Sequence, residues 1–397
     1  MLRAHPYPYR AALAICSDLD ETPDRHVYRE IARYLNTEAA TAMGPGLGLE
    51  VGNTIYFDMP PDQFAYWNTD DEGRELVRAL IRAGFVDCFH SFGDLATTRA
   101  HAGRALDELE RHGCRMEVWI DHARAVTNLG ADIMCGQGDV PGSAAYHADL
   151  TRAFGVGYVW RGRVTSVVGQ DVPRRLAGIV QRGHLLASAR TMAKEAAKGL
   201  LARGGSGKYA MHRDNAVLRP VTLRDGGAAR EFLRCNPHWL AVDEGETADG
   251  LAEVLTASML DRLVQAGGAC VLYTHLGKIA DRARPFNAAT CAALERLAAR
   301  SRSAQILVTT TRRLLGQRRA LQEARVTTAP GADGALRVDV SYAGPAADLD
   351  GLTVYVPDPA RVRVFVNGAA AASAANAPDE TGRASVSLPW PRLAFPA

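Results

Sequence analysis

Short apolar runs alternate with amphipathic segments along most of the chain. The runs with the length and composition of strands cover residues 11–17, 50–57, 86–90, 115–120, 158–160, 209–212, 238–242 and 269–273. Apolar positions recur with helical spacing over residues 72–83, 98–112, 146–154, 251–265 and 288–299. Strands that alternate with helices predict a parallel sheet covered by helices. We therefore expect an α/β fold in the form of an open or distorted (β/α) barrel.

The segment 170–208 interrupts this alternation. Residues 172–201 have a helical pattern and carry few acidic side chains against six basic ones, Arg174, Arg175, Arg182, Arg190, Lys194 and Lys198. We expect a solvated helical insertion outside the core, and a lid, a polyanion contact and a membrane-surface element are the alternatives. The run 204–208 lacks the first glycine of a phosphate-binding loop, so we expect no nucleotide site there.

The pattern changes again at about residue 326. Short alternating runs follow, at 336–342, 352–356, 362–367 and 384–388, separated by Gly, Pro, Asp and Asn. We expect residues 369–376 to be a flexible loop. The pattern predicts a small antiparallel β-rich domain over residues 326–397, after a barrel domain that spans residues 1–320.

Composition sets broad limits on function. The chain has 397 residues, of which 47% are hydrophobic and 23% charged, and a formal net charge of +2, which gives no reason to expect nucleic acid as a partner. We expect no export signal and no transmembrane segment, because no run approaches about 20 apolar residues. The seven cysteines are scattered without a Cys-x-x-Cys pair, which favours reduced thiols and a cytoplasmic protein. A homo-oligomer stays open.

Two aspartates end the first apolar run, in the sequence Ser17-Asp18-Leu19-Asp20. The end of a buried parallel strand is where α/β enzymes expose their chemistry. If the strand stays extended, Asp18 and Asp20 point to the same face. Two carboxylates there would repel each other unless a metal ion or a shared proton intervened. The pair therefore predicts a metal centre.

Histidines end three further strands. His90 closes one run and Asp94 follows four residues later, so both side chains can reach one metal ion. His122 follows the run that ends in Ile120 and Asp121, and His275 follows the late apolar run. Each histidine alone fits a structural role as well as a chemical one. Their common placement beside the paired aspartates favours the chemical one.

Weaker candidates for substrate binding or support lie near these strand ends. His147 stands at a helix start, and His212 and Arg213 follow another apolar run, where capping and local order are equally good explanations. Trp160, with Arg161 beside it, and Trp239 are able to stack on sugar rings, although buried tryptophans are the commoner case.

At these residues the chain resembles the polysaccharide deacetylase superfamily, in motif order over residues 9–315. The resemblance implies a deformed (β/α) barrel with Asp18 as general base and Asp20 as metal ligand. The usual His-Ser/Thr-x-x-His motif reads His90-Ser91-Phe92-Gly93-Asp94 here, so Asp94 stands in place of the second histidine ligand. His275 matches the catalytic acid. The arginine motif expected after the third strand is absent, and His122 occupies that region.

The resemblance implies a metal-dependent hydrolase that removes N-acetyl groups from an amino sugar, in a polysaccharide or in an intracellular glycan precursor. Its cofactor would be a divalent ion, with Zn²⁺ the first expectation, held by Asp20, His90 and Asp94. An Asp-His-Asp ligand set is less biased towards zinc than Asp-His-His. Two alternatives stay open: an amidohydrolase for a non-sugar C–N bond, and a glycan-binding or assembly protein that has lost turnover, which Asp94 and the missing arginine motif favour.

Overall fold

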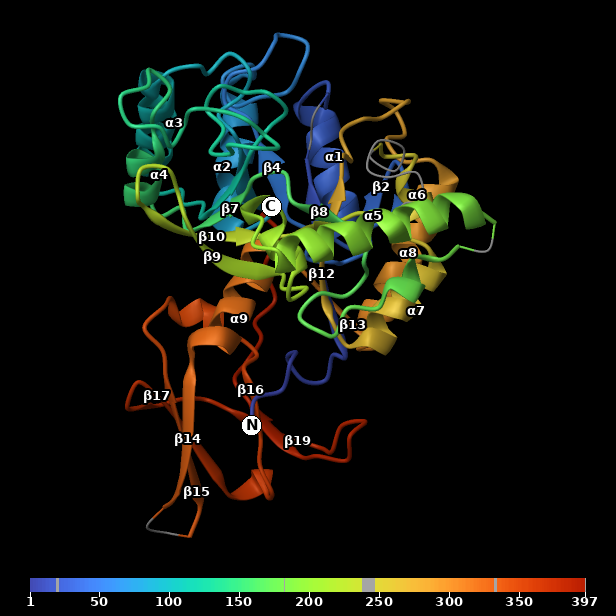
Figure 1. Ribbon diagram of the computed structural model, residues 1–397, viewed down its shortest axis with the longest axis vertical. Helices are drawn as coiled ribbons and strands as arrows, with labels where there is room; N and C mark the ends of the chain where they lie inside the picture. Colours follow the sequence, from blue (N-terminus) through green and yellow to red (C-terminus); the bar gives the residue numbers. More distant parts are fainter. Residues whose placement is uncertain (19–20, 182, 238–246, 332–333, 397) are drawn as a thin grey trace.

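The computed structural model describes residues 1–18, 21–181, 183–237, 247–331 and 334–396. Figure 1 shows a larger α/β part and a smaller β-rich part below it. None of the described helices is long and apolar enough to cross a bilayer.

A curled, mostly parallel sheet forms the centre of the larger part, and it confirms the α/β prediction. Its neighbouring strands run in the order β8 (Val164–Thr165), β11 (Arg234–Cys235), β12 (Ala269–Thr274), β1 (Ala11–Ser17), β4 (Asn53–Ile55), β5 (Val86–His90), β6 (Val118–Ile120), β7 (Tyr158–Trp160), β10 (Ala228–Phe232) and β9 (Leu218–Thr222), and β13 (Ile306–Thr309) pairs with β1. All these pairs are parallel except β9 with β10. Each residue of β1 is buried, as expected for a central parallel strand.

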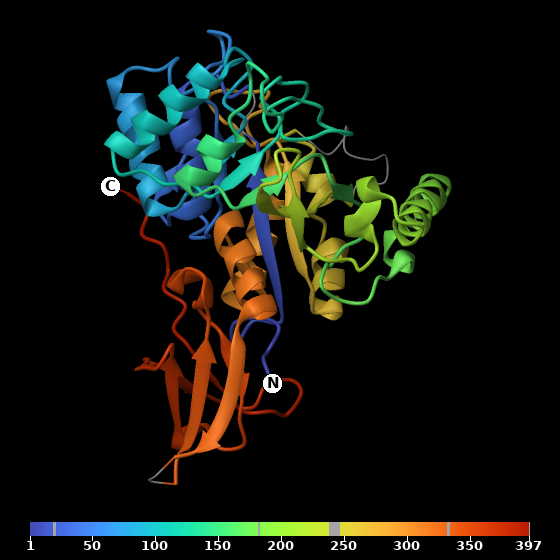
Figure 2. The same ribbon diagram turned by 60° about the vertical axis from the view of Figure 1, so that its left-hand side comes forward.

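Helices pack on the outside of this sheet (Figure 2). They are α1 (Arg25–Asn36), α2 (Asp71–Ala83), α3 (Arg99–Arg111), α4 (Ala148–Phe154), α6 (Leu251–Val254), α7 (Ala257–Ala266), α8 (Ala288–Arg302) and α9 (Thr311–Glu323). Polar side chains cap several of them; Asp70 accepts from the Gly73 amide at the start of α2, and Thr98 accepts from the His101 amide at the start of α3. The apolar helix faces and the outer sheet face enclose one large core.

The insertion contributes the short 3₁₀ helix η1 (Leu176–Ile179) and the long helix α5 (Leu185–Arg203). Helix α5 crosses the front of the α/β part in Figure 1 and lies at its outer edge in Figure 2. The prediction of a strand at 209–212 is wrong, because these residues belong to a second 3₁₀ helix, η2 (Gly207–His212). A four-residue apolar run does not distinguish the two conformations. The strand predicted at 238–242 lies outside the described residues.

The smaller part contains two sheets, which are separate from the main one. The first has the order β14 (Arg325–Pro330), β15 (Leu336–Ser341), β17 (Val362–Val366) and β18 (Ala369–Ala370), and the second β16 (Thr353–Tyr355), β20 (Ser385–Ser387) and β19 (Ala374–Asn376). The expected antiparallel pairing holds except between β15 and β17, which are parallel. The predicted loop at 369–376 contains β18 and β19. Two further 3₁₀ helices, η3 (Ala346–Leu349) and η4 (Pro359–Arg361), connect strands.

Both chain ends join the two parts together. Leu2 bridges to Val354 of β16, so the chain begins against the smaller part. The last residues return to the α/β part, where the Phe395 ring lies 5.3 Å from that of Phe85. Figure 1 shows this return, with the two termini at different parts of the molecule. A hairpin β2 (Ala40–Thr41) and β3 (Gly44–Pro45) follows α1.

Candidate functional site

Strands β1 and β12 bring Asp18 and His275 together. The two strands pair in parallel with Ser17 opposite Thr274, so the residues that follow them meet at the same edge of the sheet. The Asp18 amide donates to the Thr274 carbonyl across 2.9 Å. The His275 Nε2 atom lies 3.9 Å from Asp18 Oδ2, and both side chains are buried. The predicted base and acid are therefore neighbours.

His90 approaches the same carboxylate from β5. Its Nε2 atom is 3.7 Å from Asp18 Oδ2. The ring of Tyr56 stacks on His90 at a centroid distance of 4.5 Å and meets the edge of His122 at 5.1 Å. The His90 and His122 rings are themselves 4.8 Å apart. His90 and His275 thus face Asp18, and His122 adjoins His90.

Asp94 contacts His122. Its Oδ1 atom lies 2.9 Å from His122 Nδ1, and its side chain is 45% exposed. The turn after His90 directs it there, with positive φ angles at Ser91 and Gly93. A Cβ atom at Gly93 would lie 2.2 Å from the Asp58 carbonyl oxygen, so only glycine fits this turn.

Arg234 is the main site residue that sequence reasoning missed. It comes from β11 and is completely buried, and its Nη2 atom donates to Asp18 Oδ2 and to the Cys16 carbonyl, each across 2.8 Å. Its guanidinium carbon lies 4.4 Å from the centroid of Trp160 and 4.1 Å from that of Tyr273. Burial lowers the pKa of Arg234, but the interactions with Asp18, Cys16 and Tyr273 together outweigh burial, so the net shift of the pKa is upward.

The sequence signal for Arg234 was a charged residue inside the apolar run 232–235. A charge in a buried strand needs a partner, and the partner of Arg234, Asp18, is 216 residues away in the sequence. The resemblance implies an arginine after the third strand. The arginine that contacts Asp18 belongs to β11 instead.

Asp121 is a second buried carboxyl at this edge of the sheet. It directly follows β6, and its Oδ1 atom accepts from the Trp119 indole and the Leu129 amide, each across 2.8 Å. Its Oδ2 atom has no hydrogen-bond partner among the described residues. Burial raises the pKa of Asp121 to about 7. The sequence pattern places Asp121 at the end of this strand but indicates no role for it.

The described residues do not by themselves complete the predicted metal centre. Within those ranges, no group of three His, Cys, Asp or Glu side chains is placed to hold a metal ion. Asp20 lies outside the described residues, and the contacts of His90 and Asp94 are those given above. The donor types fit a divalent ion, since imidazole and carboxylate groups adjoin each other here. The assignment of Asp20, His90 and Asp94 as ligands stays a prediction.

His147 lies away from this cluster, in the packed layer between sheet and helices. Its Nε2 atom is 2.7 Å from the Thr127 carbonyl oxygen, and its ring packs against Trp119 and Phe92. Burial lowers the pKa of His147 to about 4. The structure thus gives His147 a place in the core.

Two other predicted residues make firm local contacts. Arg161 Nε donates to Glu231 Oε1 across 2.9 Å. His212 Nδ1 lies 3.6 Å from Glu195 Oε2, and burial lowers the pKa of His212 despite that neighbour. Trp239 lies outside the described residues.

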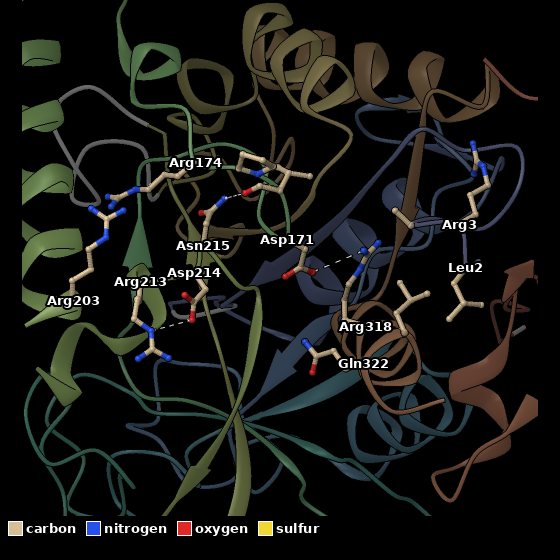
Figure 3. A pocket seen from close by; sticks show the side chains of 14 residues that line it. Leu2, Arg3, Asp171, Arg174, Arg203, Arg213, Asp214, Asn215, Arg318 and Gln322 are labelled. Atoms are coloured by element: carbon tan, nitrogen blue, oxygen red, sulfur yellow. Dashed lines mark hydrogen bonds and ion pairs between the residues drawn. The ribbon is translucent and has the colours of Figure 1, made fainter. Parts of the chain in front are cut away.

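Arg213 lines a cavity of about 770 Å³ that Asp18, His90 and His275 do not line. Figure 3 shows Arg213 paired with Asp214, while Arg318 faces Asp171 across the cavity. This cavity lies where the insertion, α9 and the start of the chain come together. It contains no other predicted site residue.

A cavity of about 430 Å³ adjoins the Asp18 cluster. Its wall includes Trp160 at the end of β7, Tyr273 near the end of β12, and His212. The Tyr273 hydroxyl lies 3.4 Å from His275 Nε2. Trp160 and Tyr273 therefore stand between this cavity and the Arg234–Asp18 pair.

No family model, curated protein or solved structure matches this chain.

Proposed function

We propose that the protein is a metal-dependent hydrolase that removes N-acetyl groups from an amino sugar, on a barrel of the deacetylase type. The carbohydrate would be a polysaccharide or a glycan precursor made inside the cell. The observation that carries the proposal is the buried Asp18 carboxylate, which Arg234 holds on one oxygen while His90 and His275 face it. Such a cluster at the carboxyl ends of parallel strands is an arrangement suited to acid–base chemistry.

The two oxygens of Asp18 have different surroundings. Oδ2 accepts from Arg234, whereas Oδ1 has no hydrogen-bond partner among the described residues. An anchored carboxylate whose other oxygen has no hydrogen-bond donor can take a proton from a water molecule bound beside it. We therefore assign the role of general base to Asp18, acting through Oδ1, with Arg234 as the residue that positions it.

His275 is the proposed general acid. It stands beside Asp18 and next to the Tyr273 hydroxyl, so both its neighbours can order the imidazole. Cleavage of an acetamide leaves an amine, which must gain a proton as the C–N bond breaks. His275 would supply that proton, and the products would be acetate and a free amino sugar.

The proposed divalent ion, with Zn²⁺ as the first expectation, would be held by Asp20, His90 and Asp94. When bound, it would polarise the acetamide carbonyl and lower the pKa of the attacking water. His122 contacts Asp94 and would orient it.

Acetate release across a panel of N-acetylated sugars and non-sugar acetamides tests this function. We expect turnover of at least one sugar, inhibition by a chelator, and a loss of about 10²–10⁴-fold in kcat for Asp18→Asn and for His275→Asn. Asp62→Asn and His26→Asn, both at exposed positions, are the matched controls and should keep wild-type rates. Turnover restricted to non-sugar acetamides would overturn the sugar assignment, and full activity of Asp18→Asn would overturn the mechanism.

A further inference from the structure

The cavity of about 430 Å³ beside the Asp18 cluster has a basic wall. We call it the lysine cavity, after Lys194, Lys198 and Lys208, which line it together with Arg163. None of its described lining residues is acidic. The insertion supplies the lysines, from α5 and η2, and the sheet supplies Trp160 and Tyr273. The insertion therefore completes a cavity whose wall, at Trp160 and Tyr273, adjoins Arg234 and His275.

Two of the four cations form ion pairs with acidic side chains that do not line the cavity. Arg163 makes two hydrogen bonds to Asp132, of 2.7 and 3.0 Å, and Lys198 lies 2.6 Å from Glu195. These acids pair with cations of the wall without lining the cavity themselves. The charge of the wall is thus reduced but not cancelled.

Lys194 and Lys208 form no ion pair with any residue that the structure describes. Both are exposed, and both line the cavity. Two ammonium groups on one cavity without a carboxylate between them attract an anion, because each gains a partner without losing another. The cavity is therefore complementary to a ligand that carries negative charge.

The few lysines of the chain are concentrated at the lysine cavity. The sequence contains four lysines, and the other 42 of its 46 basic residues are arginines. Three of the four lysines line this one cavity. A lysine ammonium is a compact charge that binds phosphate or carboxylate groups, in contrast to the planar arginines that form the ion pairs elsewhere in this chain.

We propose that the lysine cavity binds an anionic group, a phosphate or a carboxylate, that is attached to the N-acetylated sugar. This inference rests on the proposed function, and it narrows the substrate to acidic N-acetyl sugars. Ile133 and Met134 line the cavity together with the lysines and would contact the sugar ring that joins the anion to the acetamide. The buried rings of Trp160 and Tyr273 form the part of the wall that adjoins Arg234 and His275.

Three probes distinguish the sources of charge: neutral N-acetylglucosamine, N-acetylglucosamine 1-phosphate and N-acetylmuramic acid, which carries a carboxylate. We expect at least one acidic probe to exceed the neutral one by about tenfold or more in kcat/KM and in affinity, a preference that falls as salt rises. The double variant Lys194→Gln/Lys208→Gln should lose this preference. Arg190→Gln removes an exposed cation from the same helix outside the cavity and should keep it.

Chemical acetylation of lysine gives a readout that needs no turnover. With four lysines in the chain, mass spectrometry follows each one separately. An acidic probe should protect Lys194 and Lys208 relative to Lys278, which does not line the cavity.

Protection and binding without deacetylation of any probe would support the cavity and overturn the proposed function. Equal deacetylation of neutral and acidic probes, unchanged in the double variant, would overturn the cavity and leave the function standing. Failure of binding, protection and turnover together would overturn both.

Discussion

The Nη2 atom of Arg234 lies 2.8 Å from the Oδ2 atom of Asp18, and neither side chain is more than 1% exposed. Transferring two charges from water to the protein interior costs free energy. A buried ion pair is therefore stable only where further interactions offset that cost. Arg234 finds them in the Cys16 carbonyl and in the rings of Trp160 and Tyr273. The pair fixes the orientation of the carboxylate that we assign as the base.

Replacing Arg234 with methionine should therefore affect both stability and activity. The apolar side chain keeps much of the volume but leaves Asp18 as a buried charge without its cation. We expect a loss of about 3–5 kcal/mol in the free energy of unfolding, measured by urea denaturation. Activity should fall in kcat, because the carboxylate is no longer oriented.

Two further variants show whether the loss comes from the buried pair. Arg74 pairs with an exposed aspartate, so Arg74→Met should cost no more than about 1 kcal/mol. The double variant Asp18→Asn/Arg234→Met removes both charges and should recover part of the stability lost in Arg234→Met. A single variant as stable as the wild type would show that the pair does not stabilise the fold.

Metal analysis of purified variants tests the predicted ligands. We expect the wild-type protein to bind a divalent ion stoichiometrically and His90→Ala and Asp94→Asn to lose it, because each removes a predicted donor. His122→Ala should weaken binding by about 10–100-fold, the effect of losing an orienting contact. Loss of the ion in His122→Ala but not in Asp94→Asn would show that the two roles are reversed.

The strands that form the site could be predicted because each is a short apolar run ended by polar residues. The limits of β1, β5 and β7 match the sequence pattern, and β12 extends it by one residue. Parallel strands place their carboxyl ends at one edge, so the meeting of Asp18, His90 and His275 followed from the pattern as well.

Arg234 could not be placed in the same way. Its strand has only two residues, too short for any periodicity, and its partner Asp18 is fixed by sheet order rather than by local sequence. Helix α9 was not predicted, because its many arginines obscure the apolar periodicity in the sequence. Its apolar side chains are buried by packing against β1 and the smaller part. Pairings across hundreds of residues are set by tertiary packing, which single-sequence patterns do not encode.

The variant His275→Gln should distinguish the proposed role of His275 as general acid from that of Asp18 as general base. If His275 protonates the departing amine, its loss should lower kcat for amide substrates much more than for an ester of the same sugar, whose alcohol leaving group needs less help from an acid. Asp18→Asn should slow both reactions alike. The comparison requires only initial rates on paired substrates, and an equal effect of His275→Gln on amide and ester would contradict the assigned role.

Asp121 predicts a dependence of stability on pH. Its pKa is raised from 3.8 to about 7 in the fold, so the unfolded chain releases its proton first as pH rises. The contribution of Asp121 is fully present below pH 3.8 and is lost as pH rises to about 7, by about 4 kcal/mol. Unfolding of Asp121→Asn across this range should lack that fall, and a pH profile parallel to that of the wild type would contradict the shift.

His147 predicts the opposite change of stability with pH. Its pKa is lowered from 6.5 to about 4 by burial, so the unfolded chain takes up a proton that the folded chain refuses. The stability that His147 contributes is present above pH 6.5 and is lost as pH falls to about 4, by about 3 kcal/mol. His147→Gln can still donate to the Thr127 carbonyl but carries no titrating group, so its unfolding free energy should fall less over this interval. The exposed His26→Gln should follow the wild type at every pH, and the same acid loss in His147→Gln as in His26→Gln would show that His147 titrates normally in the fold.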